Sequence, residues 1–174
     1  DNRASVACGI LVLQELTKTE HVLGVQFVAT SQEEYTGLGA RTHAYRLSVD
    51  YGVAVDVTHG EHPDLKEYEY YALGSGPAIV RGATVPPRLF ELLVETAKSA
   101  GIPYQIEPVA SHTGTDAEDI AFTRQGIPTC VVSIPLRYMH TPVEVVSLTD
   151  IKNAARLVAA FIKKLGDQHS QAMT

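Results

Sequence analysis

PPRLFELLVETAKSAGIPYQIEPV, residues 86–109, contains a complete helix–strand unit. Its two prolines suit the first turn of a helix, and residues 88–100 continue with apolar side chains at helical spacing. Gly101 is a typical residue at which a helix ends. Residues 104–109 then have the pattern of a strand. Alternation of this kind along a whole chain is typical of a sheet that is covered by helices.

The rest of the chain repeats this alternation. Four further apolar runs are typical of buried strands: residues 22–30 (VLGVQFVAT), 51–58 (YGVAVDVT), 77–80 and 129–134 (TCVVSI). Further helices are expected at residues 4–16, 40–46, 116–124 and 150–165, with Thr149 as the N-cap of the last and Gly166 at its end. Continuous apolar strands predict an α/β fold, a three-layer sandwich whose mostly parallel mixed sheet is flanked by helices.

Composition and charge exclude several classes of function. The chain has 174 residues, 45% of them hydrophobic and 20% charged, with a net charge of −6. An acidic chain lacks the basic face that nucleic acids require. No apolar run approaches the roughly 20 residues that span a bilayer. We therefore expect a globular protein with neither nucleic acid nor membrane as its partner.

Two cysteines, Cys8 and Cys130, lie within apolar runs. Their spacing supports neither a metal pair nor a disulfide, so buried free thiols are the simpler interpretation. Free thiols are typical of a reducing compartment, which predicts a cytoplasmic protein.

Carboxylates and a histidine gather at the predicted strand ends. Glu33 and Glu34 follow one strand, Asp56 interrupts a second, His140 follows a third, and Asp1 precedes the first helix. Taken singly, each has an ordinary explanation as a surface, capping or loop residue. Loops at the ends of strands are where sites form in such sheets. Together, these ligand types predict a site for a divalent metal.

Five ordered motifs resemble those of the glutamyl/tetrahedral aminopeptidases, a family of cocatalytic metallopeptidases of which some members have been named endoglucanases. The motifs are DNR (1–3), SQEEYTGLGA (31–40), VDV (55–57), GTDA (114–117) and IPLRYMHTPVE (134–144). The resemblance extends over residues 1–165. It implies a phosphorylase/hydrolase-like zinc-peptidase fold, of which this chain would be the C-terminal catalytic part.

The resemblance also implies roles for individual residues. Asp1 would bridge two metal ions, Asp56 would complete the first metal site, and Glu34 and His140 would hold the second. Glu33 would be the general base. Two cations that share an anion acidify a water molecule between them, and an adjacent carboxylate can accept its proton. Zinc or cobalt is the expected metal, although oxygen and nitrogen ligands also accept manganese.

Four further residues are expected at the substrate. By resemblance, Gly114, Thr115 and Asp116 shape the substrate pocket, although Thr115 or Asp116 could equally cap a helix. Arg137 would meet a substrate carboxylate or a neighbouring acid, and a surface role is the alternative.

The chain departs from the family pattern in one important respect. The upstream segment that supplies a further histidine ligand, at least one strand and a dimerisation insert is not part of this sequence. We therefore expect residues 1–166 to form the C-terminal part of the catalytic domain and residues 167–174 to form a frayed tail. We also expect poor occupancy of the first metal site, little or no activity from this chain alone, and an open sheet edge that favours self-association. The full-length protein is expected to be a homo-oligomer that acts on peptides.

Two other functions remain open at this point. An endoglucanase-type glycoside hydrolase would use Glu33 with a second carboxylate, but the chain has no Trp and few aromatic residues to stack against sugars. The other alternative is a fragment without catalytic activity.

Overall fold

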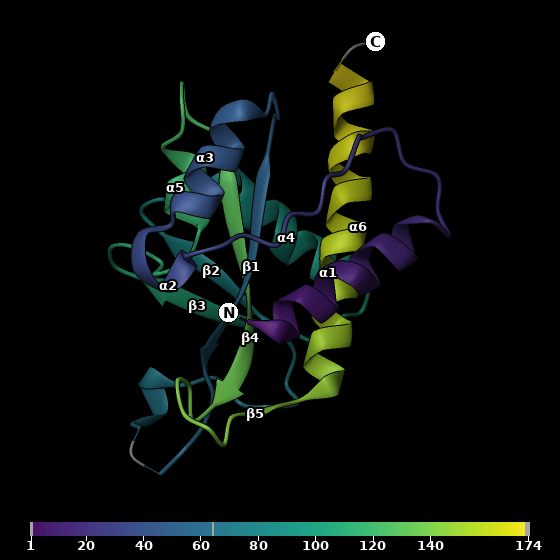
Figure 1. Cartoon of the computed structure of the whole chain (residues 1–174). Coiled ribbons are helices and arrows are strands. Elements are labelled where there is room, and N and C mark those ends of the chain that lie inside the picture. Colours follow the sequence, from purple (N-terminus) through teal and green to yellow (C-terminus); the bar gives the residue numbers. More distant parts are fainter. Residues whose placement is uncertain (1, 64, 173–174) are drawn as a thin grey trace.

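The computed structural model describes residues 2–63 and 65–172 of the chain, and these surround a mixed sheet (Figure 1). The path of the sheet is β1 (Gly52–His59), β4 (Thr129–Arg137), β2 (Ala78–Gly82) and β3 (Gln105–Val109). β1 is parallel to β4, and β2 is parallel to β3, whereas β2 and β4 run antiparallel. The short β5 (Val145–Val146) pairs with the end of β4.

Helices cover both faces of this sheet. One layer contains α1 (Arg3–Leu16), α4 (Pro87–Ser99) and α6 (Leu148–Ala172), and the opposite layer contains α2 (Glu33–Thr36), α3 (Leu38–Arg46) and α5 (Ala117–Ala121). A 3₁₀ turn, η1 (Glu67–Glu69), lies in the long connection between β1 and β2. The predicted three-layer α/β sandwich is confirmed.

β4 is the centre of the core. Every residue of it except Arg137 is buried, because helices lie on both of its faces and strands on both of its edges. Phe161 and Leu157 of α6 and Leu93 of α4 are completely buried in the same cluster. The continuous apolar run in β4 is thus explained by burial on both faces, as expected for a central strand.

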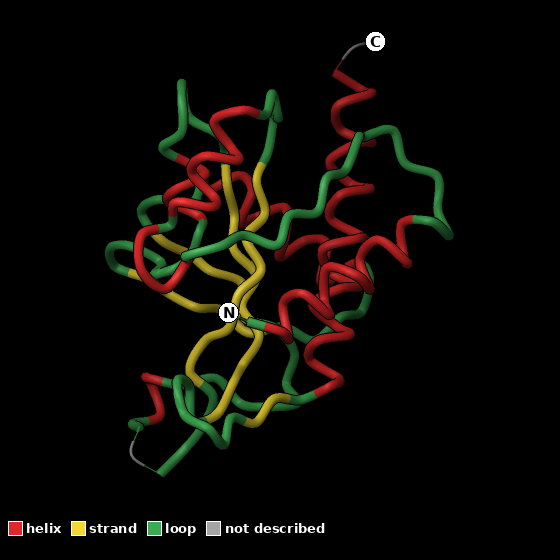
Figure 2. The backbone as a smooth tube through the Cα atoms, viewed as in Figure 1, coloured by secondary structure: helices red, strands yellow, loops and turns green. Residues whose placement is uncertain are grey.

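Residues 22–30 do not form the predicted strand. They are extended, and Figure 2 draws them as part of the loop that connects α1 to α2. Among the described residues, none forms a β-ladder with them. Leu23 and Val25 pack against the core, and the Phe27 ring lies directly over Gly9 of α1. The apolar pattern reflects this packing, but a strand also requires a neighbour that accepts its backbone hydrogen bonds.

The last helix continues beyond the predicted stop at Gly166. α6 runs on to Ala172, and a Cβ atom on Gly166 would lie 2.9 Å from Cγ2 of Val22. Glycine is needed here for close packing of residues 22–23 against the helix. The N-cap was also misplaced, because Ser147, and not Thr149, accepts a hydrogen bond from the Asp150 N–H.

The helix expected at residues 116–124 is only five residues long, and Arg124 has a left-handed backbone (φ 56°) that is incompatible with a continued helix. Cys8 and Cys130 are buried free thiols, as predicted, and burial raises the pKa of each to about 12. Within the described ranges, no helix has the length and apolarity that crossing a bilayer requires.

Candidate active site

A cavity of about 460 Å³ opens beside the strand β1, where the loops that follow several elements meet. The predicted site residues that line it are Glu33, Glu34, Asp56, Gly114, Thr115 and His140. They come from α2, β1, the loop before α5 and the loop after β4. Segments more than 100 residues apart in the sequence therefore contribute to this cavity.

The two adjacent glutamates begin the short helix α2. Gln32 precedes them with a left-handed backbone (φ 62°), which is uncommon for a residue other than glycine. Its carbonyl accepts hydrogen bonds from the N–H groups of Thr36 and Gly37, both at 3.0 Å. This tight turn places Glu33 and Glu34 in the first helical turn, where both side chains reach the cavity.

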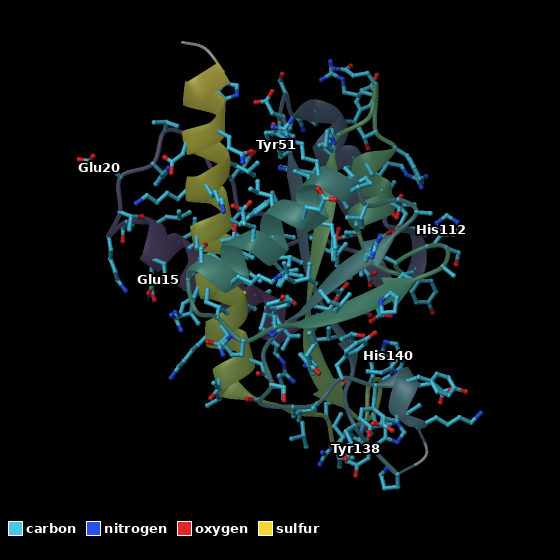
Figure 3. All side chains as sticks on the ribbon, turned by 180° about the vertical axis from the view of Figure 1, so that it is seen from behind. Glu15, Glu20, Tyr51, His112, Tyr138 and His140 are labelled. Carbon is cyan, nitrogen blue, oxygen red and sulfur yellow. The ribbon has the colours of Figure 1, made fainter. Side chains whose placement is uncertain are left out.

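Glu34 and His140 meet across the cavity. The His140 Nε2 atom lies 3.2 Å from the Glu34 Oε1 atom, although 106 residues separate them. His140 also has a positive φ (60°), and its N–H donates to Glu144 Oε1 at 2.8 Å. Strained backbone at a position of this kind is typical of functional residues. Figure 3 shows His140 beyond the end of β4 and His112 in the loop after β3, and both line the cavity.

Asp56 is held in place by two donors. Its Oδ1 atom accepts hydrogen bonds from the Asn2 side chain and from the Val57 N–H, each at 2.8 Å. Asn2 also caps α1, because its side-chain oxygen accepts from the Ser5 N–H. Burial raises the pKa of Asp56 to about 6, and the nearby carboxylates of Asp116 and Glu34 add to the rise.

Asp116 lies next to this group without lining the cavity. Its Oδ2 atom accepts a hydrogen bond from Thr30 at 2.5 Å. The Oδ1 atom is buried, and no partner for it exists in the described part of the chain. Burial raises the pKa of Asp116, since an unpaired buried carboxylate is costly to ionise.

Negative charge accumulates in the site, where the carboxylates of Asp56, Asp116 and Glu34 all act on Glu33. Burial and these neighbouring carboxylates together raise the pKa of Glu33 to about 7, and burial is the largest cause. Carboxylates and an imidazole are suitable ligands for divalent zinc or cobalt. The unpaired Asp116 oxygen and the raised pKa values are what a cation would relieve, so the residues fit a metal.

The described residues hold part of the expected ligand set. No cluster of three potential ligands is found within residues 2–63 and 65–172, and the close pair is Glu34 with His140. Asp1, the expected bridging ligand, lies outside the described residues.

Arg137 is not brought to the cavity. Its guanidinium Nε donates to the Glu61 carbonyl oxygen, and it is not among the residues of the cavity wall. Sequence reasoning also missed Glu118, Asp119 and Glu144, which do line the cavity. Glu144 belongs to the motif at residues 134–144. Nothing in the sequence around Glu118 and Asp119 indicated that they would line a cavity.

Comparisons with known proteins show which family this chain resembles. Residues 1–157 match the family described as M42 glutamyl aminopeptidase. A lysyl aminopeptidase of Pyrococcus furiosus is 38% identical over 146 residues, which are 84% of this chain and 42% of that protein. A putative aminopeptidase of Acetivibrio thermocellus is 40% identical over 166 residues, covering 93% of this chain and 49% of that protein.

A solved structure shows the same fold. The TET aminopeptidase of a Thaumarchaeota archaeon from marine sediment is 32% identical, with a TM-score of 0.85, and the match covers all of this chain and half of that one. The chain thus spans about half the length of the relatives that it matches.

Proposed function

Because the chain belongs to the M42 glutamyl aminopeptidase family, we propose that it forms the catalytic part of a metal-dependent enzyme that releases N-terminal residues from peptides. The observation that carries the proposal is the approach of Glu34 to His140 at 3.2 Å, with Glu33 beside them in the same cavity.

The ligands divide into two sets. Glu34 and His140 would hold one cation. Asp56 would hold the other, and Asp1 would be shared between them. Bound metal would supply a water molecule of lowered pKa and polarise the carbonyl of the scissile bond. Zinc or cobalt suits this combination of oxygen and nitrogen ligands.

Glu33 would be the general base. It is adjacent to a ligand residue, it lines the cavity, and burial raises its pKa to about 7 in the metal-free protein. A base with a pKa near the working pH accepts a proton readily and can also return it. Glu33 would take the proton from water and deliver it to the amine that leaves.

Gly114 and Thr115 line the cavity, and Asp116, the next residue, is hydrogen-bonded to Thr30. Gly114 has a left-handed backbone (φ 69°), and no atom lies within 4 Å of where its Cβ would be. This open wall would receive the N-terminal residue of the peptide. Arg137 has no part in the proposed site, because its Nε donates to the Glu61 carbonyl oxygen away from the cavity wall.

The chain alone would be a weak catalyst, since the ligands that it contributes leave the Asp56 cation with few protein partners, and catalytic zinc usually has three. A cytoplasmic location and a homo-oligomeric assembly of the full-length protein are part of the same proposal. Carboxylates beside an imidazole suit a metal better than the paired carboxylates of a glycosidase, so we do not propose the glycosidase alternative.

Mass spectrometry of a short peptide, incubated for many hours with the chain and zinc or cobalt, tests the proposal. We expect slow loss of N-terminal residues that stops with EDTA. In the Glu33→Gln variant, we expect the rate of N-terminal residue loss to fall about 100-fold or more, while zinc binding in calorimetry is retained. If neither EDTA nor the Glu33→Gln substitution slows the loss of N-terminal residues, the proposed function is wrong. A wild-type chain that binds no zinc would also contradict it.

A further inference from the structure

An acidic residue outside the expected ligand set touches the turn that carries Glu33 and Glu34. Asp119 of α5 places its carboxylate against Gly37, the residue that ends α2. A Cβ atom on Gly37 would lie only 1.5 Å from Asp119 Oδ2. Gly37 also has a left-handed backbone (φ 59°). The Asp119 carboxylate can therefore occupy this position only because residue 37 has no side chain.

Arg41 fixes the other oxygen of the same carboxylate. Its Nε and Nη2 atoms both donate to Asp119 Oδ1, at 2.9 and 2.5 Å. The Asp119 side chain is only 18% exposed, whereas that of Arg41 is 64% exposed. One oxygen thus faces the guanidinium of α3 and the other faces the end of α2, so Asp119 joins three short elements.

Few other polar contacts connect this segment to the rest of the protein. Within the described residues, the side chains of residues 30–41 make polar contacts to distant side chains at three points: Thr30 to Asp116, Glu34 to His140, and Arg41 to Asp119. Glu34 is itself an expected ligand. The Arg41–Asp119 pair is therefore the one of these contacts that lies against the C-terminal end of the turn and involves no expected metal ligand.

We propose that Asp119, held by Arg41, is a positioning residue that fixes the α2 turn so that Glu33 and Glu34 face the cavity. Asp119 itself contacts neither metal nor substrate in this proposal. Its effect on metal binding rests on the proposed function. A ligand helix that is fixed beforehand loses less freedom when a cation binds. Loss of a partner that orients a ligand typically costs about 10–100-fold in metal affinity.

The first measurement needs no metal. Backbone ¹⁵N order parameters of residues 33–37 should be near 0.85 in the EDTA-treated wild type and should fall below about 0.6 in Asp119→Ala and in Arg41→Met. Arg41→Met changes an exposed side chain and leaves the core untouched. Glu95→Gln, which removes the remote Lys164–Glu95 ion pair (2.9 Å), is the matched control and should leave these values unchanged. Order parameters that stay at the wild-type level in both variants would overturn the proposal.

The second measurement separates the two proposals. Zinc titration by calorimetry should give a dissociation constant at least about tenfold higher in Asp119→Ala and Arg41→Met than in the wild type and Glu95→Gln. Equal zinc affinity in all four proteins would contradict the positioning role. A wild type that binds no zinc would instead contradict the proposed function, and the order parameters alone would then decide whether Asp119 fixes the turn.

Discussion

Replacing Asp56 with asparagine should stabilise the metal-free protein at pH 8. Burial raises the pKa of the Asp56 carboxyl from 3.8 to about 6. The folded state therefore binds more protons than the unfolded state between about pH 4 and pH 6. Stability that is present below pH 4 is lost as the pH rises through this window, because the carboxylate must then be ionised in a partly buried site.

The size of this effect follows from the two pKa values. The rise of the Asp56 pKa from 3.8 to about 6 corresponds to ~3 kcal/mol of unfolding free energy at pH 8. Since Asp56 is only partly buried, we expect Asp56→Asn to recover about 1.5 to 3 kcal/mol there. Asparagine keeps an oxygen that can accept the hydrogen bonds from Asn2 and Val57. Near pH 4 the variant and the wild type should be almost equally stable.

Urea unfolding in EDTA at pH 4, 6 and 8 measures this prediction. The exposed residue Asp50, two positions before β1, gives the matched control Asp50→Asn, which should change little at any pH. Added zinc should then stabilise the wild type more than Asp56→Asn, because a ligand that binds the folded state raises its stability by mass action. A variant that is less stable than the wild type at pH 8 would refute the reasoning.

Further predictions concern the metal, the packing and the core. His140→Ala should weaken zinc binding by more than the roughly 10–100-fold that loss of an outer partner costs; calorimetry with unchanged affinity would contradict the ligand role. Gly9→Ala should destabilise the chain by about 1–3 kcal/mol, because the new Cβ would lie 2.2 Å from the Phe27 ring; a full-stability variant would show that residues 22–30 do not pack on α1. Phe161→Ala, at a completely buried position, should cost about 3–5 kcal/mol in urea unfolding; a loss below 1 kcal/mol would contradict its place in the core.

Much of the fold could be predicted from local pattern. The apolar run in β4 reflects a strand that is buried on both faces, and the helical periodicity of α4 reflects a helix that is buried on one face. Residues 22–30 are a largely apolar run, as β4 is, yet they form no strand. A strand is completed by a neighbour, and composition contains no information about whether that neighbour is present.

Part of the candidate site could also be predicted from the sequence. The ligand types at strand ends suggested a metal, and the structure brings Glu34 to His140 and places Glu33 and Asp56 in the same cavity. The contact between Asp119 and Arg41 was not foreseen. It joins side chains 78 residues apart on two short helices, and neither residue interrupts an apolar run in the way that Asp56 does. Gly166 was misread because glycine serves both helix ends and close packing.

Anomalous diffraction from crystals grown with zinc tests the metal site most directly. The account predicts a zinc peak about 2.0–2.2 Å from both Glu34 Oε1 and His140 Nε2, with Glu33 in the same cavity and not bound to that ion. Zinc found only elsewhere on the surface, or Glu34 and His140 turned away from each other in the crystal, would contradict it.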